Sequence, residues 1–67
     1  MIVIELTFLT YYNNIYMGFY RKSAYFHFCT DINCATKFDK VEADCIMVNG
    51  FPTGEFAGWT KRPVMVT

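Results

Sequence analysis

β-Branched and aromatic residues dominate the N-terminal part of the chain. They form three runs, at residues 2–10, 15–21 and 24–29, and this composition is typical of β-strands. Asn13-Asn14 separates the first two runs, and Asn tolerates the left-handed backbone conformation that a tight hairpin turn requires. Lys22-Ser23 is a second turn candidate, before the third run. The pattern therefore predicts a three-stranded antiparallel meander.

The two predicted turns determine which residues of the meander share a face. They place Phe8 opposite Phe19 and Phe19 opposite Phe26, so that alternation along the strands separates phenylalanine from tyrosine. The predicted core face holds Ile4, Leu6, Phe8, Met17, Phe19, Phe26 and Phe28. The opposite face holds Thr7, Leu9, Tyr11, Tyr16, Tyr20, Tyr25, His27 and Cys29. A shift of one residue in either turn would scramble this separation.

The second half of the chain predicts a helix followed by further β-structure. Thr30 or Asp31 can cap a short helix that continues to about Phe38. Apolar and polar residues then alternate over residues 41–48, which predicts a fourth strand. Asn49-Gly50 follows that strand and is a hairpin signal.

The C-terminal residues complete the expected fold. Gly54, Gly58 and Trp59 indicate an irregular loop, and a short last strand is expected at residues 64–66. Residues 1–67 are therefore expected to form one small α+β domain. Its sheet is mainly antiparallel, and it includes one short helix.

Composition limits the classes of protein to which the chain can belong. Of its 67 residues, 54% are hydrophobic and 19% aromatic, whereas a disordered tail would be charged and poor in aromatic residues. Six basic and six acidic residues give zero formal charge, which argues against a generic nucleic-acid-binding protein. A chain of about 60 residues buries only about 60% of the surface that its unfolded form exposes, so the core is marginal. Such a protein is expected to associate with another protein or with a second copy of itself.

Three cysteines and one histidine are the candidate metal-binding residues. An odd cysteine count fits a reduced, cytoplasmic protein, and no basic residue precedes Arg21 as a signal peptide would require. His27, Cys29, Cys34 and Cys45 offer four potential zinc ligands, but their spacing departs from the close pairs of known zinc sites. Free cysteine is more often a small buried hydrophobic residue. We therefore expect no metal and no other cofactor.

The residue pattern does not indicate catalysis. Cys29 and His27 could act as a nucleophile and a base, but nothing in the sequence orients the imidazole. Gly50, Gly54 and Gly58 recur every four residues without the strand and Lys of a phosphate-binding loop. We therefore predict a non-enzymatic protein.

The tyrosine-rich face is the most specific feature of the sequence. Tyrosine provides a large, rigid contact area and is enriched in protein interfaces. The predicted partner-binding residues are Tyr11, Tyr16, Tyr20 and Tyr25, together with Glu42 and Asp44 of the net acidic middle segment. Two alternatives stay open. Phe56 and Trp59 could cover this face, or its rings could stack on nucleic-acid bases next to the doublets Arg21-Lys22 and Lys61-Arg62.

In general appearance the chain is similar to small phage-encoded proteins, which are short, aromatic-rich, cysteine-containing and without catalytic motifs. This resemblance implies an inhibitor in the host cytoplasm that binds a host protein, such as a defence nuclease or the transcription machinery. One alternative is a structural subunit of a larger assembly or homo-oligomer. Another is a small zinc- or single-strand nucleic-acid-binding module. Membrane insertion is not expected, because residues 2–20 include Glu5 and two Asn residues and alternate as strands do.

Overall fold

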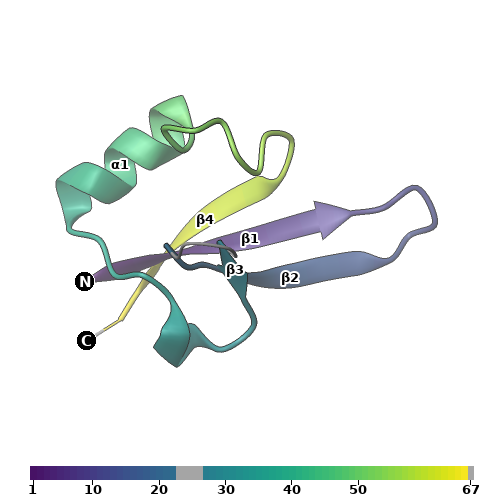
Figure 1. Cartoon of the computed structure of the whole chain (residues 1–67), viewed down its shortest axis with the longest axis horizontal. Coiled ribbons are helices and arrows are strands. Elements are labelled where there is room, and N and C mark those ends of the chain that lie inside the picture. Colours follow the sequence, from purple (N-terminus) through teal and green to yellow (C-terminus); the bar gives the residue numbers. More distant parts are fainter. Residues whose placement is uncertain (23–26, 67) are drawn as a thin grey trace.

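The computed structural model describes residues 1–22 and 27–66, which form one four-stranded antiparallel sheet and a single α-helix. The strands β1 (Ile2–Leu9), β2 (Ile15–Tyr20), β3 (Phe28–Cys29) and β4 (Thr60–Met65) lie in the order β3-β2-β1-β4 (Figure 1). The helix α1 (Lys40–Asn49) packs on one face of the sheet, and a 3-10 turn, η1 (Ile32–Cys34), follows β3. The predicted α+β class and the antiparallel meander of the first three strands are confirmed.

The register of the β1–β2 hairpin differs from the predicted one. Phe8 pairs with Tyr16, three positions before the predicted partner Phe19. The turn explains this difference, because it runs from Thr10 to Asn14, where the amide of Thr10 donates to the carbonyl of Asn14 at 2.8 Å. An odd displacement of the register exchanges the two faces of β2 relative to β1.

The exchanged faces reverse the predicted positions of two residues on β2. Tyr20, predicted for the face opposite the core, is only 6% exposed and stacks on Phe51 with ring centroids 4.1 Å apart. Met17, predicted for the core, is exposed. On β1, where the face does not change, Ile4 and Leu6 are fully buried as predicted. The tyrosines therefore do not share one exposed face.

The third strand is short in the described part of the chain. Ser23, Tyr25 and Phe26, on which the second predicted turn and part of the third strand depend, lie outside the described residues. Phe28 pairs with Tyr20 and lies against β2 at Gly18. A Cβ atom on Gly18 would come within 2.4 Å of the Phe28 ring, so glycine is required for this close approach.

Residues 40–49 form the helix α1, although their alternation predicted a strand over residues 41–48. The side chain of Asp39 accepts a hydrogen bond from the amide of Glu42 at 2.8 Å, which is an N-cap. Gly50 ends the helix with a positive φ of 79°, so the Asn49-Gly50 signal marks a helix C-cap and not a hairpin. The predicted fourth strand was wrong because this pair of caps favours a helix.

The predicted helix between Asp31 and Phe38 shortens to the single turn η1. Asp31 caps it as expected, since its side chain accepts from the amide of Asn33 at 2.9 Å. Beyond η1 the backbone is extended, and Phe38 forms an antiparallel bridge with Ile2 through hydrogen bonds of 2.7 and 2.8 Å. The pairing with β1 competes with helix formation here, and the helix prediction for this segment was wrong.

The last strand is longer than predicted. β4 begins at Thr60 and pairs antiparallel with β1 as far as Met65. It includes Pro63, which lacks an amide donor but is tolerated because β4 is an edge strand.

The core lies between the sheet, α1 and the loop after α1. Its buried residues are Ile4, Leu6, Tyr20, Phe38, Ala43, Ile46 and Phe51. Phe56 and Trp59 are half-buried and pack against this cluster. The alternative that the second half of the chain covers the tyrosine face therefore holds for Tyr20, whose ring meets Phe56 edge-on at 6.3 Å.

Candidate functional site

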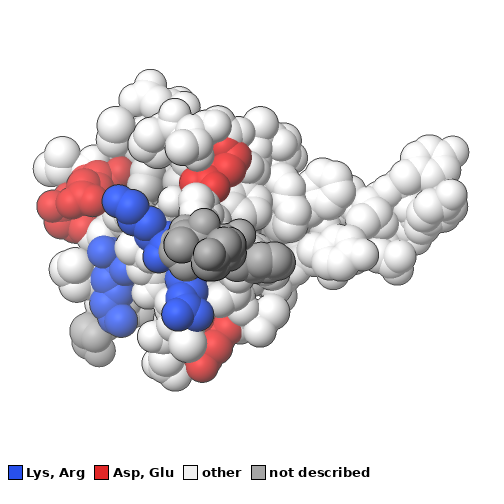
Figure 2. Space-filling model, viewed as in Figure 1, with Lys and Arg blue, Asp and Glu red and all other residues white. Residues whose placement is uncertain are grey.

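The distal half of the β1–β2 hairpin projects from the rest of the protein (Figure 1). β4 pairs with β1 only as far as Thr7, and β3 pairs with β2 only at Phe19 and Tyr20. Residues 8–17, which we name the hairpin arm, therefore form a two-stranded ribbon. The arm carries no charged residue, and in Figure 2 the visible Lys, Arg, Asp and Glu side chains all lie on the globular end.

Large hydrophobic side chains cover the arm. The exposed ones are Phe8, Leu9, Tyr11, Tyr12, Ile15, Tyr16 and Met17, with exposed fractions of 94% for Tyr11 and 81% for Tyr12. The four rings of the arm are those of Phe8, Tyr11, Tyr12 and Tyr16. At roughly 200 Å² for one aromatic side chain, they together expose on the order of 500 Å² to solvent. Exposed apolar patches larger than a few hundred Å² mark interaction sites in soluble proteins. The arm is therefore the candidate interaction surface.

Backbone hydrogen bonds hold the tip of the arm in a defined conformation. The amide of Asn13 donates to the carbonyl of Thr10 at 3.0 Å, and the amide of Asn14 donates to the Thr10 hydroxyl at 3.0 Å. Asn13 adopts the left-handed conformation expected for this asparagine pair, with φ of 64°. At the base of the arm, Phe8 stacks on Trp59 with ring centroids 5.1 Å apart. The arm is thus an ordered ribbon with apolar side chains toward solvent.

The predicted partner-binding tyrosines separate into three groups. Tyr11 and Tyr16 lie on the arm and are exposed, so the alternative that the rest of the chain covers them does not hold. Tyr20 is buried in the core, and Tyr25 lies outside the described residues. Leu9 is predicted for the same face as these tyrosines, whereas Tyr12, Ile15 and Met17, which are also exposed on the arm, are not. The sequence signal for them is the absence of charge between Glu5 and Arg21.

The two predicted acidic residues are not on the arm. Glu42 and Asp44 lie on α1, which packs at the globular end, away from the tip of the arm (Figure 1). Asp44 forms an ion pair with Lys40 at 3.0 Å. The structure therefore does not bring the tyrosines and these carboxylates together on one surface.

A polar cluster joins the sheet to the loop after α1. The hydroxyl of Tyr20 donates to Oε1 of Glu55 at 3.0 Å, and Oε2 of Glu55 is paired with Nδ1 of His27. Burial, the hydrogen bond to Glu55 and the negative charge of Glu55 raise the pKa of Tyr20 to about 12. Burial opposes the ionisation of Glu55, but hydrogen bonds from His27, Tyr20 and Thr53 outweigh it and lower the pKa of Glu55. Glu55 is thus an ionised carboxylate that is hydrogen-bonded to the side chains of Tyr20 and His27.

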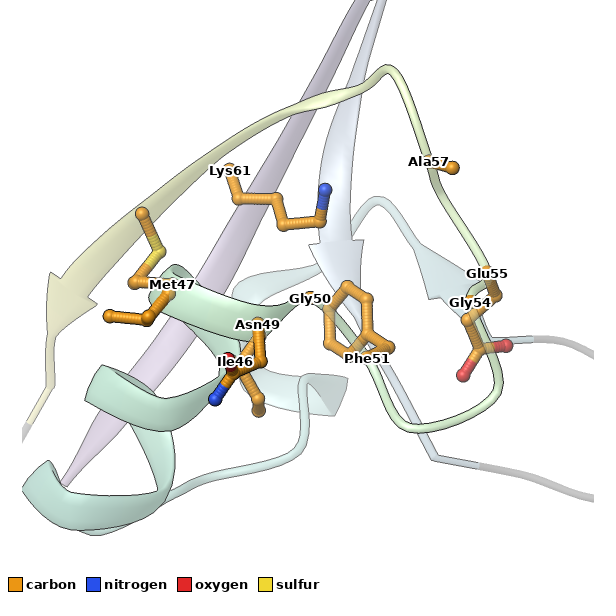
Figure 3. A pocket seen from close by; sticks show the side chains of 10 residues that line it. Ile46, Met47, Asn49, Gly50, Phe51, Gly54, Glu55, Ala57 and Lys61 are labelled. Carbon is orange, nitrogen blue, oxygen red and sulfur yellow. The ribbon is translucent and has the colours of Figure 1, made fainter.

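Two pockets lie on either side of this loop. One, of about 500 Å³, is bordered by Lys22, His27, Cys45 and Glu55 among others. The other, of about 360 Å³, lies between the end of α1, the loop and Lys61, whose side chain extends across it in Figure 3. The Lys61 ammonium donates to the loop carbonyls of residues 56 and 59 at 3.1 and 3.3 Å. The charges of Glu55 and Lys61 are therefore engaged within the protein, and neither pocket indicates a particular ligand.

The four zinc candidates are not brought together. Cys29 and Cys34 lie on either side of Asp31, to which their thiols donate at 3.4 and 3.9 Å. Cys45 lies on α1, and His27 is engaged with the loop. Within residues 1–22 and 27–66, no three His, Cys, Asp or Glu side chains are arranged to hold a metal ion. Burial, then the adjacent Cys34 thiol, raises the pKa of Cys29, so this thiol is not activated as a nucleophile.

Comparison of the chain with protein-family models, with curated protein sequences and with solved structures gives no match. Among the described residues, no helix has the length and apolar character needed to cross a bilayer. The candidate site therefore rests on the geometry and chemistry of the hairpin arm.

Proposed function

We propose that this protein is a non-enzymatic binding module that engages another protein through its hairpin arm. The observation that carries this proposal is the ordered, charge-free ribbon at residues 8–17 with its exposed aromatic side chains. Tyrosine anchors of this kind provide much of the binding energy in protein interfaces. A ribbon that projects on two strands fits a concave, apolar surface on the partner.

The arm is better suited to a protein partner than to nucleic acid. Binding to single strands combines stacking with cations that meet the phosphates. The arm has no Lys or Arg, because Arg21 and Lys22 follow the proximal end of β2 and Lys61 and Arg62 lie on β4. A module that occupies a partner's apolar surface would exclude other ligands from it, which is how a small inhibitor of a host protein would act.

Paired substitutions test this proposal. In the arm variant, Tyr11→Ser and Tyr12→Ser remove the two most exposed rings. In the control variant, Val41→Ser and Val48→Ser remove side chains that are 79% and 81% exposed on α1. Each tagged protein is expressed in its source cells, and proteins that co-purify in stoichiometric amount are quantified by mass spectrometry. Far-UV circular dichroism establishes that both variants are folded.

We expect one protein to co-purify with the wild type and with the α1 control, and to be lost from the arm variant. Truncation of an aromatic hot-spot residue typically weakens binding by at least 2 kcal/mol. Retention of the same protein by the arm variant at wild-type yield would contradict the proposal. So would its loss from the α1 control alone.

A further inference from the structure

The outer edge of β2 is the feature of the arm that identifies a specific kind of partner. Hydrogen-bonded and non-hydrogen-bonded residue pairs alternate along an antiparallel ladder. Thr10 and Asn14 are a hydrogen-bonded pair, and this fixes which peptide groups of β2 point toward β1. Phe8 and Tyr16 are the next bonded pair, so the peptide groups of Ile15 and Met17 point away from β1. Since β3 ends at Cys29, no described strand flanks Ile15–Met17 on that side.

This edge lacks the features by which sheets avoid pairing with other chains. Charged side chains and proline normally protect an exposed edge strand. β4, the edge strand on the other side of the sheet, has Lys61, Arg62 and Pro63 in sequence. The distal part of β2 has none of these, since residues 15–18 are Ile, Tyr, Met and Gly. The two edges of one sheet are therefore protected very differently.

We infer that the β2 edge pairs antiparallel with the β2 edge of a second copy of this chain, forming an isologous dimer. A twofold axis through Tyr16 places Ile15 of each copy opposite Met17 of the other. Both residues have outward peptide groups, so each opposed pair exchanges two hydrogen bonds. The two Tyr16 rings lie across the axis from each other on one face of the joined sheet. The edge is thus complementary to itself, as a twofold interface requires.

The charge and the area of the arm also favour a second copy. Residues 6–20 carry no charge, so antiparallel pairing of two arms places no like charges together. The protein has zero formal net charge, which leaves no overall repulsion between copies. On the pairing strand itself, Ile15, Tyr16 and Met17 are each more than half exposed, so edge-to-edge pairing covers apolar area on three large side chains of each copy.

This inference rests on the proposed use of the arm for protein binding and adds a second copy of this chain as a partner at the β2 edge. Native mass spectrometry and sedimentation velocity across a micromolar to millimolar concentration series test it. Met17→Lys places two like charges next to the twofold axis, whereas Met65→Lys makes the same substitution on the protected edge strand β4. Both methionines are exposed, so both variants are expected to fold.

We expect a wild-type dimer, a dimer dissociation constant raised by about 30-fold or more in Met17→Lys, and a dimer of wild-type strength in Met65→Lys. A wild type that is monomeric throughout the series would overturn the inference. So would a dimer that Met17→Lys leaves intact.

Hydrogen exchange of the wild type gives an independent readout that does not depend on a variant. Dimerisation through β2 slows exchange of the Ile15 and Met17 amides as concentration rises, and unchanged exchange in a dimer would place the contact elsewhere. Failure of the dimer leaves the co-purification experiment on Tyr11 and Tyr12 to decide the proposed function separately.

Discussion

Replacing Gly18 by alanine is expected to destabilise the protein, although the same change stabilises most strands. Glycine in a strand interior is less favourable than alanine by roughly 0.5–1 kcal/mol. The close approach of β3 reverses this preference here. A Cβ atom on Gly18 would lie 2.4 Å from Cζ of Phe28 and 2.5 Å from the carbonyl oxygen of Cys29.

The size of the effect follows from these two contacts. Carbon atoms pack best at about 3.5–4.0 Å, so the Phe28 ring would have to retreat by about 1 Å. The Cys29 oxygen belongs to the backbone paired with Phe19 and cannot rotate away. Overpacking of this kind costs roughly 1–3 kcal/mol, and we expect a value at the upper end of that range for Gly18→Ala. A chain of this length has on the order of 3–10 kcal/mol of stability in total, so the loss is measurable.

Urea denaturation provides the assay. Trp59 is the only tryptophan, and its ring packs against Phe28 with centroids 5.6 Å apart, so its fluorescence reports on this part of the fold. The double variant with Phe28→Leu should recover part of the loss, because the smaller side chain makes room for the methyl group. A Gly18→Ala protein that is as stable as the wild type or more stable would refute the packing argument, as would the absence of coupling to Phe28.

The cap of α1 and the buried hydroxyl of Tyr20 give two further predictions. Asp39→Ala should lower the free energy of unfolding by about 1 kcal/mol in denaturation followed by circular dichroism, while Asp39→Asn, an equally good cap, stays near wild type. Because the pKa of Tyr20 is raised to about 12, its stabilising effect is complete below the ordinary value of 10 and is lost as pH rises toward 12. An absorbance titration should therefore show a late-ionising tyrosine component that Tyr20→Phe removes; a late component that this substitution leaves unchanged would contradict the assignment.

Local signals predicted the first two strands, because β-branched and aromatic residues dominate them. They did not locate the turn between those strands, since either residue of Asn13-Asn14 tolerates a left-handed conformation. Only Asn13 adopts it. The resulting register decides whether Tyr20 or Phe19 enters the core, and it depends on tertiary packing with Phe51 and the rest of the core cluster.

The helix α1 was missed because two local signals conflict in its sequence. Alternation over residues 41–48 favours a strand, while Asp39 followed by Glu42 three positions later favours a helix start. The helix forms because it places Ala43 and Ile46, three positions apart, on one buried face. Recognition of the caps at both ends would have predicted it.

The polar cluster could not be predicted from sequence, because its members are far apart in the chain. Tyr20 and Glu55 are separated by 35 positions, and His27 and Glu55 by 28. Their meeting depends on α1, which the sequence pattern assigned to a strand, and on the path of the loop after it. Tyr11 and Tyr16, in contrast, are predicted from local pattern alone to lie on the face opposite the core, and both are exposed on the arm.

The two halves of the hairpin differ in burial, and the proposed function assigns folding to one half and binding to the other. In the proximal half, Ile4, Leu6 and Tyr20 are buried in the core, whereas the large side chains of residues 8–17 are exposed. At roughly 25 cal/mol per Å², covering the four rings of the arm would contribute on the order of 10 kcal/mol before the cost of association. That gross value is similar to the whole stability of a domain of this size. Folding of the chain alone leaves this surface uncovered, and under the proposed function contact with a second molecule covers it.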